Sequence, residues 1–487
     1  MPLLGSDSGG STDAPLVPLK VNGSVGKAQI DFEGQALALL GAPRIDGRIK
    51  LRAGSLGRVG DALGLTLPET APFQLQANLR HGTGVWRVRD VQLSVGHSHI
   101  GGDYRYDTRV DPPLLSGQLN ASQIRLADLG PLVGVQAEGK KHPDGKVLPE
   151  REFDIPSLAA MDADVQVNID ELDFGTPSLR PVFDLRTHLV LSGSVLRLEN
   201  LQAHAGGGSL SGMSQLDGRK GAAVWHAELR FNGLDVAKWI AGVRKSGSDA
   251  DGTKQPSIEP VNVSSPATTA LRPVAAYLTG ELDAYMKVRG AGASTASILA
   301  SLDGDAQATI RHGTVSHLVT EILGIDVAQA LGVAVRGDDA LPLRCARLDL
   351  NIDKGILVPR VAIFDNRDST VRLTGNLNLR DEAIALRATT SPKDFSLVAL
   401  RAPVIVSGTL GAPHVEIDAA PVVARAAASI ALGVLATPVA ALLPLIDPGS
   451  KEEGDPCAMS APHASQAAAD HGARVSAAQG GKSSSSP

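Results

Sequence analysis

The residues of this chain that could do chemistry are two closely spaced histidines and several scattered carboxylates. His97 and His99 lie in the segment Gly96-His-Ser-His-Ile100. On a β-strand this spacing places both imidazoles on one face, where they could share a metal ion. The simpler interpretation is a pair of polar side chains on the solvent face of the strand, and His204 fits that interpretation too. The segment also approaches the Gly-x-Ser-x-Gly turn of serine hydrolases, but Ile100 occupies the position of the last glycine.

Carboxylates lie on or beside the strand-like segments of the C-terminal third, at Asp349, Asp381, Glu382 and Asp418. A pair of carboxylates can cleave a glycosidic bond, but solvated residues on the polar face of a strand produce the same pattern. The chain contains no His-Glu-x-x-His, no phosphate-binding loop and no dinucleotide fingerprint. The sequence therefore predicts a protein with no enzymatic activity, no cofactor and no metal. A polymer-processing enzyme is the weakest alternative.

Composition and cysteine count narrow the class of protein further. The 487 residues are 43% hydrophobic but only 3% aromatic, and the formal net charge is −6. Because no cluster of lysine and arginine stands out, nucleic acid is not an expected partner. Cys345 and Cys457 are the two cysteines, too few for a disulfide framework or a zinc site. They could pair in an oxidising compartment, or both could remain free thiols.

The elements that would position these residues are β-strands. Apolar and polar residues alternate with period two most clearly between Cys345 and Asp418, which is typical of strands with one apolar and one solvated face. We predict a mainly β fold, an elongated, twisted antiparallel sheet or groove built of repeated hairpin units with a few covering helices. Thirteen residues are predicted to line one continuous apolar surface: Leu348, Leu350, Ile352, Val371, Leu373, Leu377, Leu379, Ile384, Leu386, Val404, Val406, Val415 and Ile417.

A repeat supports the addition of hairpins along the chain. Leu-Ser-Gly or a close variant occurs six times within strand-like segments, and the block Val85–Asp107 aligns with Val195–Asp217. Gly102 then falls on Gly212. Each unit of such a sheet needs neighbours to bury its apolar face.

The chain divides at its polar, Gly/Ser/Pro-rich stretches. The predicted parts are a disordered start (1–20), a β repeat (21–135), a loop (136–152), a β repeat (153–242), a linker or loop (243–270), a C-terminal β meander (271–418) that includes a helix over 314–331, an apolar helix (419–446) and a disordered tail (447–487).

Three pieces of the meander carry a resemblance when taken in order. They are Gly375-Asn-Leu-Asn-Leu379, Ser391-Pro-Lys393, and a strand that ends in Gly408 and Thr409 with Pro413 after it. This order resembles the C-terminal region of the AsmA family of bacterial envelope proteins. The resemblance implies that Gly313 to Ser316 opens a helix over the sheet, and that the chain is similar to bridge-like carriers that conduct lipid along a β-groove.

The resemblance also implies a place and partners. The expected location is the periplasmic side of the bacterial inner membrane. The expected partners are membrane phospholipids and envelope or membrane proteins. The expected roles are outer-membrane biogenesis, lipid transport and the targeting of proteins to membranes. AsmA-like proteins usually begin with one membrane-spanning helix, and Met1 to Asp7 does not read as a secretion signal. Residues 426–446 carry no charge and are expected to lie as a helix on the end of the sheet, with an interfacial membrane contact and a membrane-spanning segment as the alternatives.

Two functions remain open. In the first, the apolar face binds lipid, and few aromatic rings leave room for acyl chains. In the second, the chain is an envelope scaffold with a closed β core that binds only protein partners. Copurification of lipid with the protein distinguishes them.

Overall fold

The structure is a computed structural model that describes most of the chain in segments. The described residues are 17–25, 28–37, 44–55, 70–129, 146–150, 152–153, 155–175, 179–240, 278–316, 340–367, 369–393, 403–418, 420, 423–424, 427–429, 431 and 457. These residues form twenty β-strands and a few short helices. The mainly β prediction is therefore confirmed.

The strands are long and are separated mostly by tight turns. Their bounds are β1 (Val17–Val25), β2 (Ala28–Leu37), β3 (Arg44–Ala53), β4 (Phe73–Gly82), β5 (Val85–Val95), β6 (Ser98–Asp107), β7 (Leu114–Arg125), β8 (Asp162–Asp173), β9 (Val182–Ser192), β10 (Val195–Ala205), β11 (Gly208–Asp217), β12 (Ala223–Asp235), β13 (Glu281–Gly292), β14 (Asp303–Ser316), β15 (Ala340–Asp353), β16 (Ile356–Asn366), β17 (Ser369–Asn378), β18 (Ala383–Pro392), β19 (Val404–Thr409) and β20 (Ala412–Ile417).

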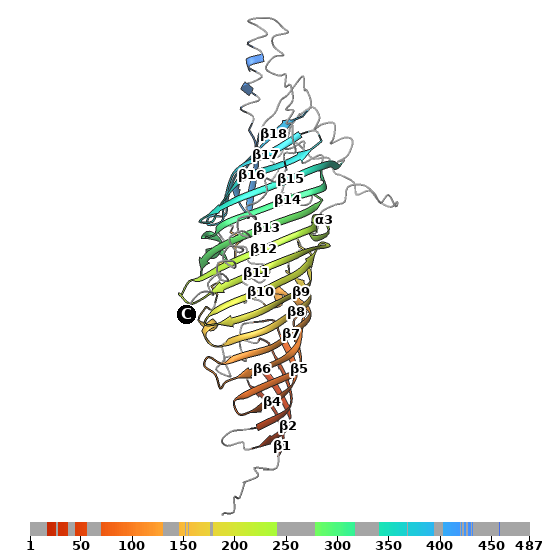
Figure 1. The fold of residues 1–487 in the computed structure, drawn as a ribbon, viewed down its shortest axis with the longest axis vertical. Helices are drawn as coiled ribbons and strands as arrows, with labels where there is room; N and C mark the ends of the chain where they lie inside the picture. The colour runs from red at the N-terminus through yellow and green to blue at the C-terminus, as the bar shows by residue number, and fades with distance from the viewer. Residues whose placement is uncertain are drawn as a thin grey trace, which may run out of the picture.

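Each strand pairs with the next one along the chain, so the described strands form one open, twisted sheet. The strands follow one another along the long axis of the molecule, from β1 at one end to β18 near the other (Figure 1). Antiparallel pairing joins all neighbours except β7 and β8, which run parallel. Parallel neighbours need a long crossover, and the chain between β7 and β8 includes α2 (Leu126–Leu129) and the 3-10 helix η2 (Ile155–Ala159).

The repeat seen in the sequence extends to backbone conformation. Asp90 on β5 and Asn200 on β10 both have positive φ, 52° and 53°, at an irregularity in the strand pairing. Gly102 on β6 and Gly212 on β11 have φ of 139° and 153°, and a Cβ on either glycine would overlap a carbonyl oxygen of the next strand. Only glycine fits such a close approach. These units bend at the same places because the same residue types recur.

The turns of the two repeats are closed by the same ion pair. The Asp107 carboxylate accepts from Arg109 Nε at 2.8 Å, and the Asp217 carboxylate accepts from Arg219 Nε at 2.9 Å. The hydrogen bonds from Arg219 lower the pKa of the Asp217 carboxyl to about 2, and those from Arg109 lower the pKa of Asp107 well below its usual range. Both carboxylates therefore stay charged at neutral pH.

Short helices lie along the two edges of the sheet, where strands end. In α3 (Val236–Trp239), the Asp235 carboxylate accepts from Ala237 N at 3.0 Å and from Lys238 N at 3.2 Å. In α4 (Thr295–Ala300), Ser294 and Ser297 form a capping box. These side chains satisfy backbone N–H groups that have no partner inside a helix.

Several predicted boundaries differ from the structure. Residues 17–20, predicted to be disordered, belong to β1, and residues 314–316, predicted to open a helix, belong to β14. Residues 317–331 lie outside the described residues, as does most of the tail over 447–487. The described positions between 420 and 431 are helical, and the rest of the range 419–446 lies outside the described residues. The sheet is not uniformly antiparallel, because β7 and β8 are parallel.

Candidate functional site

The candidate site is the apolar face of the sheet, defined by the thirteen residues predicted above and the residues in register with them. Leu348 pairs with Ala362, Ile352 with Leu357, and Leu357 with Leu377. Further pairs are Val371 with Phe364, Leu373 with Ala388, Leu350 with Pro359, Leu377 with Ile384, Leu386 with Val406, Val404 with Ile417, and Val406 with Val415. Leu379 lies just past β17 and packs against the buried cluster that includes Ile352. Directly opposed residues share a face, so the register brings these side chains together.

The apolar face continues beyond the C-terminal meander. One row of paired positions crosses seven consecutive strands, β12 to β18, as Ala227, Val288, Gly304, Ile352, Leu357, Leu377 and Ile384. At the other end, Val21, Phe32, Ile49 and Ala77 form a row over β1 to β4. Five clusters of buried apolar residues occupy this face in turn along the sheet. The face is therefore continuous along the described strands.

Exposure varies along the apolar face. Val371, Ala388 and Val404 are buried, whereas Leu350, Leu386 and Val406 in the middle of their strands are only partly buried. At the two ends of the sheet, Val21 is 44% exposed and Ile417 is 51% exposed. Apolar surface in contact with water is unfavourable by about 25 cal/mol per Å², so a long face of this kind favours an apolar occupant.

Tyr104 is an aromatic residue that packs against one of the buried clusters of the apolar face. Its hydroxyl donates to the Gly101 carbonyl at 3.1 Å. Burial, with a smaller contribution from Asp103, raises the pKa of Tyr104 to about 12. The phenol is therefore neutral at physiological pH and adds no charge to the face.

One edge of the sheet is bordered by a segment that we call the rim strap, residues 146–150 and 152–153. Val147 N and Leu148 N donate to the Glu382 carboxylate at 2.7 and 3.0 Å. Ala296 N donates to Pro149 O at 2.9 Å, and Phe153 N donates to Ala293 O at 2.7 Å. The strap thus fastens the β17–β18 turn and the neighbourhood of α4 to a segment that precedes β8. The predicted loop over 136–152 includes this strap except for Phe153.

A buried carboxylate lies near the opposite edge. Asp365 is fully buried, and its Oδ1 accepts from Lys393 Nζ at 2.6 Å and from Thr370 Oγ1 at 2.6 Å. Lys393 also donates to the Asn366 carbonyl at 2.6 Å. Cys345 pairs with Asp365 in register and is joined to Cys457 in a disulfide. Lys393, at the end of the Ser391-Pro-Lys393 segment, and Arg344, whose Nε lies 3.7 Å from Asp365 Oδ2, therefore provide the cations for this buried carboxylate.

The residues considered for catalysis or metal binding have separate partners. His97 Nδ1 lies 3.6 Å from Asp128 and His204 Nδ1 lies 3.7 Å from Asp184, whereas His99 is exposed. Asp349 lies 3.6 Å from Arg360, and Asp418 accepts from Arg387 at 2.8 Å. Asp381 is exposed and accepts from Asn378 Nδ2 at 2.8 Å. Within the described residues, no three histidine, cysteine or acidic side chains gather as a metal site.

Glu382 corrects the interpretation of the carboxylates as solvated residues. Its side chain is only 2% exposed, because the rim strap covers it.

No described helix is long and apolar enough to cross a membrane.

Comparison with known proteins identifies the family of this chain. The model of the AsmA family matches residues 73–252 and 274–361, which is more than half of the chain. The chain belongs to the AsmA family. The AsmA family protein YhjG of Escherichia coli (strain K12) is 30% identical over 460 residues, which cover 90% of this chain and 62% of that relative. No solved structure matches the chain.

Sequence reasoning missed two features of this AsmA family member. The resemblance points to the Ser391-Pro-Lys393 segment, but the sequence does not predict that Lys393 neutralises the buried Asp365 carboxylate or that the strap binds Glu382. A charged residue next to Phe364 in an otherwise apolar strand end was the signal for Asp365. No local signal could connect Glu382 with Val147, because 235 residues separate them.

Proposed function

We propose that this AsmA family member is a non-enzymatic envelope protein that binds, and conducts, phospholipid acyl chains along its apolar face. The observation that carries the proposal is the continuity of that face over an open sheet. Val, Leu, Ile and Ala supply most of the surface, and such side chains leave space above the sheet that rings would fill. Acyl chains match this surface, because apolar contact is non-directional and needs no hydrogen bonds.

The alternative is an envelope scaffold with a closed core that binds only protein partners. A closed core requires a second layer over the apolar face. The described strands all belong to one sheet in which each pairs with its chain neighbours, so they supply no second sheet. This favours the lipid-binding proposal over the scaffold.

The cellular role follows from the family and is part of the proposal. AsmA proteins are envelope proteins, so we infer a periplasmic location, at the inner membrane, and a role in outer-membrane biogenesis, lipid transport and membrane-protein targeting. The partners are membrane phospholipids, and envelope or membrane proteins. The matched relative is longer than this chain, and its other parts could contribute to such a role.

Mass spectrometry of lipid copurified with the protein tests the proposal. Leu386→Asp places a charge on the apolar face, where Leu386 is only partly buried and pairs with Gly375 and Val406. Ala385→Asp is the matched control, because Ala385 is the adjacent residue, is exposed and lies on the other face. An unpaired charge in an apolar site costs several kcal/mol, so Leu386→Asp should lose bound lipid and Ala385→Asp should keep it.

Circular dichroism establishes that both variants fold. If both fold and retain the same phospholipid content as the original chain, the apolar face is not the lipid site. If the original chain carries no lipid and takes up none from vesicles, the scaffold becomes the better account.

A further inference from the structure

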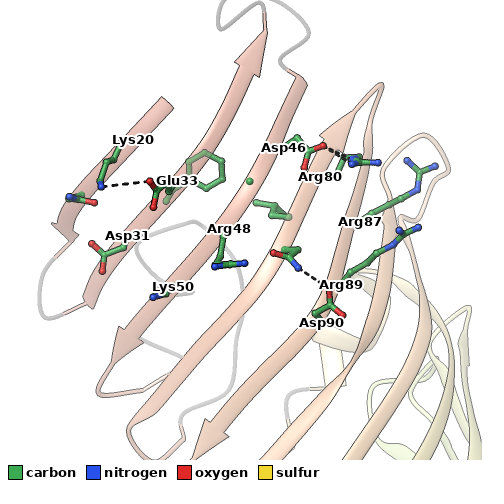
Figure 2. Close-up of a pocket in the computed structure, with 15 residues that line it drawn as sticks. Lys20, Asp31, Glu33, Asp46, Arg48, Lys50, Arg80, Arg87, Arg89 and Asp90 are labelled. Carbon is green, nitrogen blue, oxygen red and sulfur yellow. Dashed lines mark hydrogen bonds and ion pairs between the residues drawn. The ribbon is translucent and has the colours of Figure 1, made fainter. Parts of the chain in front are cut away.

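The polar face of the first five strands, opposite the apolar face, contains a pocket rich in cations. Its volume is about 770 Å³, and β1 to β5 all contribute to it. The lining side chains shown in Figure 2 include six basic residues, Lys20, Arg48, Lys50, Arg80, Arg87 and Arg89, and four acidic residues, Asp31, Glu33, Asp46 and Asp90. We call this the cationic pocket.

Only part of this charge is neutralised by the protein. Lys20 Nζ lies 3.8 Å from Glu33, and Arg80 Nη2 lies 2.6 Å from Asp46. Asp90 accepts instead from the Asn78 amide at 2.8 Å. Among the described residues, no ion pair involves Arg48, Lys50, Arg87 or Arg89. Arg48 and Lys50 lie opposite Glu33 and Asp31 in strand register but form no ion pair with them, so four exposed cations remain available to a ligand.

Strand register places these cations around one point. Arg48 on β3 and Arg89 on β5 are both paired with Asn78 on β4, so they flank Asn78 on its two sides. Neighbouring strands lie about 4.8 Å apart, and arginine side chains are long enough to meet over the strand between them. In Figure 2, Arg48 and Lys50 lie on one side of β4, and Arg87 and Arg89 lie on the other.

Three arginines lie directly opposite one another across β4, β5 and β6. Arg87 is paired with Arg80 on one side and with Arg105 on the other. Asp46 neutralises Arg80 and Asp107 neutralises Arg105, but no acidic residue in the described part of the chain forms an ion pair with Arg87. Like charges directly opposite each other destabilise a sheet, and a bound anion would remove that repulsion.

We propose that the cationic pocket binds a phosphate-bearing anion, held by Arg48 and Arg89 over Asn78 with Lys50 and Arg87 beside them. Arginine forks pair with phosphate oxygens through two parallel hydrogen bonds, which favours phosphate over a smaller or singly charged anion. The site lies on the face opposite the acyl-chain face and does not depend on the proposed function. The phosphate could belong to a soluble molecule or to a lipid headgroup.

Titration calorimetry of the full chain with inorganic pyrophosphate is the first test. The double variant Arg48→Gln/Arg89→Gln should weaken binding by about tenfold or more, because each charge-assisted hydrogen bond contributes measurably. The double variant Asp46→Asn/Arg80→Gln is the control, since it alters the same pocket without changing its net charge. It should bind pyrophosphate within about twofold of the original chain.

Flotation with vesicles separates the two sources of phosphate. Binding to phosphatidylcholine vesicles that contain phosphatidylglycerol, with competition by pyrophosphate and loss in Arg48→Gln/Arg89→Gln, identifies a lipid headgroup. Pyrophosphate binding without flotation identifies a soluble ligand, and both results support the site. Absence of binding to either probe, or equal affinities of the original chain and Arg48→Gln/Arg89→Gln, overturns the proposal.

Discussion

The contact between Glu382 and the rim strap leads to a local prediction. Glu382→Gln replaces one carboxylate oxygen with an amide group that cannot accept a hydrogen bond. Either Val147 N or Leu148 N, which donate at 2.7 and 3.0 Å, then faces a donor. A hydrogen bond to a charged group contributes roughly 1.5–3 kcal/mol. Taking about 2 kcal/mol, opening of the strap becomes about 30-fold more frequent.

Hydrogen–deuterium exchange of the Val147 and Leu148 amides measures this opening, which is a local rather than a global event. Asp381→Asn is the control, because Asp381 is the neighbouring residue, is exposed and loses the same charge. Glu382→Gly is a second probe. Glycine adopts the backbone φ of 57° at this position more easily than glutamate does. The variant nevertheless lacks the carboxylate, so the strap should be released. Unchanged exchange in Glu382→Gln, or equally fast exchange in Asp381→Asn, would refute the reasoning.

Three further predictions concern stability. The pKa of Asp217 is lowered to about 2, and that of Asp107 is also lowered, so their contribution is present above about pH 4 and is lost as the pH falls toward about 2. Asp107→Asn/Asp217→Asn should flatten this acid limb of Tm against pH, and an unchanged limb would contradict the assignment. Cys345→Ser/Cys457→Ser should lower the free energy of unfolding in urea by up to about 4–5 kcal/mol, since the crosslink spans 112 residues, and an unchanged midpoint would contradict this. Gly212→Ala should lower Tm more than Ala222→Gly at an exposed turn, because a Cβ at Gly212 would overlap the Glu228 carbonyl; equal shifts would argue against the close approach.

Much of the sheet could be predicted because period-two alternation is a local property. Leu373 and Arg372 point to opposite faces whatever strand lies beside them, so parity alone groups the residues of the apolar face. The sequence repeat also predicts matching backbone geometry, since Gly102 and Gly212 meet the same steric requirement in both units. The exact pairing of β16 is harder to predict from the sequence. Its alternation is interrupted by Pro359 at a pairing irregularity.

Contacts between distant segments could not be predicted from patterns. Glu382 reads as a solvated turn residue, yet the rim strap buries it. The parallel pairing of β7 and β8 depends on the path of the chain between them and not on the residues of either strand. The burial of Asp365 is hidden for the same reason, because its cations are Lys393, which follows β18, and Arg344 on β15. Local periodicity therefore predicts faces, whereas burial of charge depends on tertiary neighbours.

These distant contacts bear on how the sheet unfolds. A sheet made by adding hairpins has mainly nearest-neighbour interactions, and such proteins can lose units one at a time from an end. The rim strap opposes this, because it precedes β8 in the chain but is bound to α4 and to the β17–β18 turn. Detachment of β17 and β18 must therefore also break the strap contact with Glu382. The strap couples units that do not touch in the sheet, so the apolar face is kept continuous by more than the hydrogen bonds between adjacent strands.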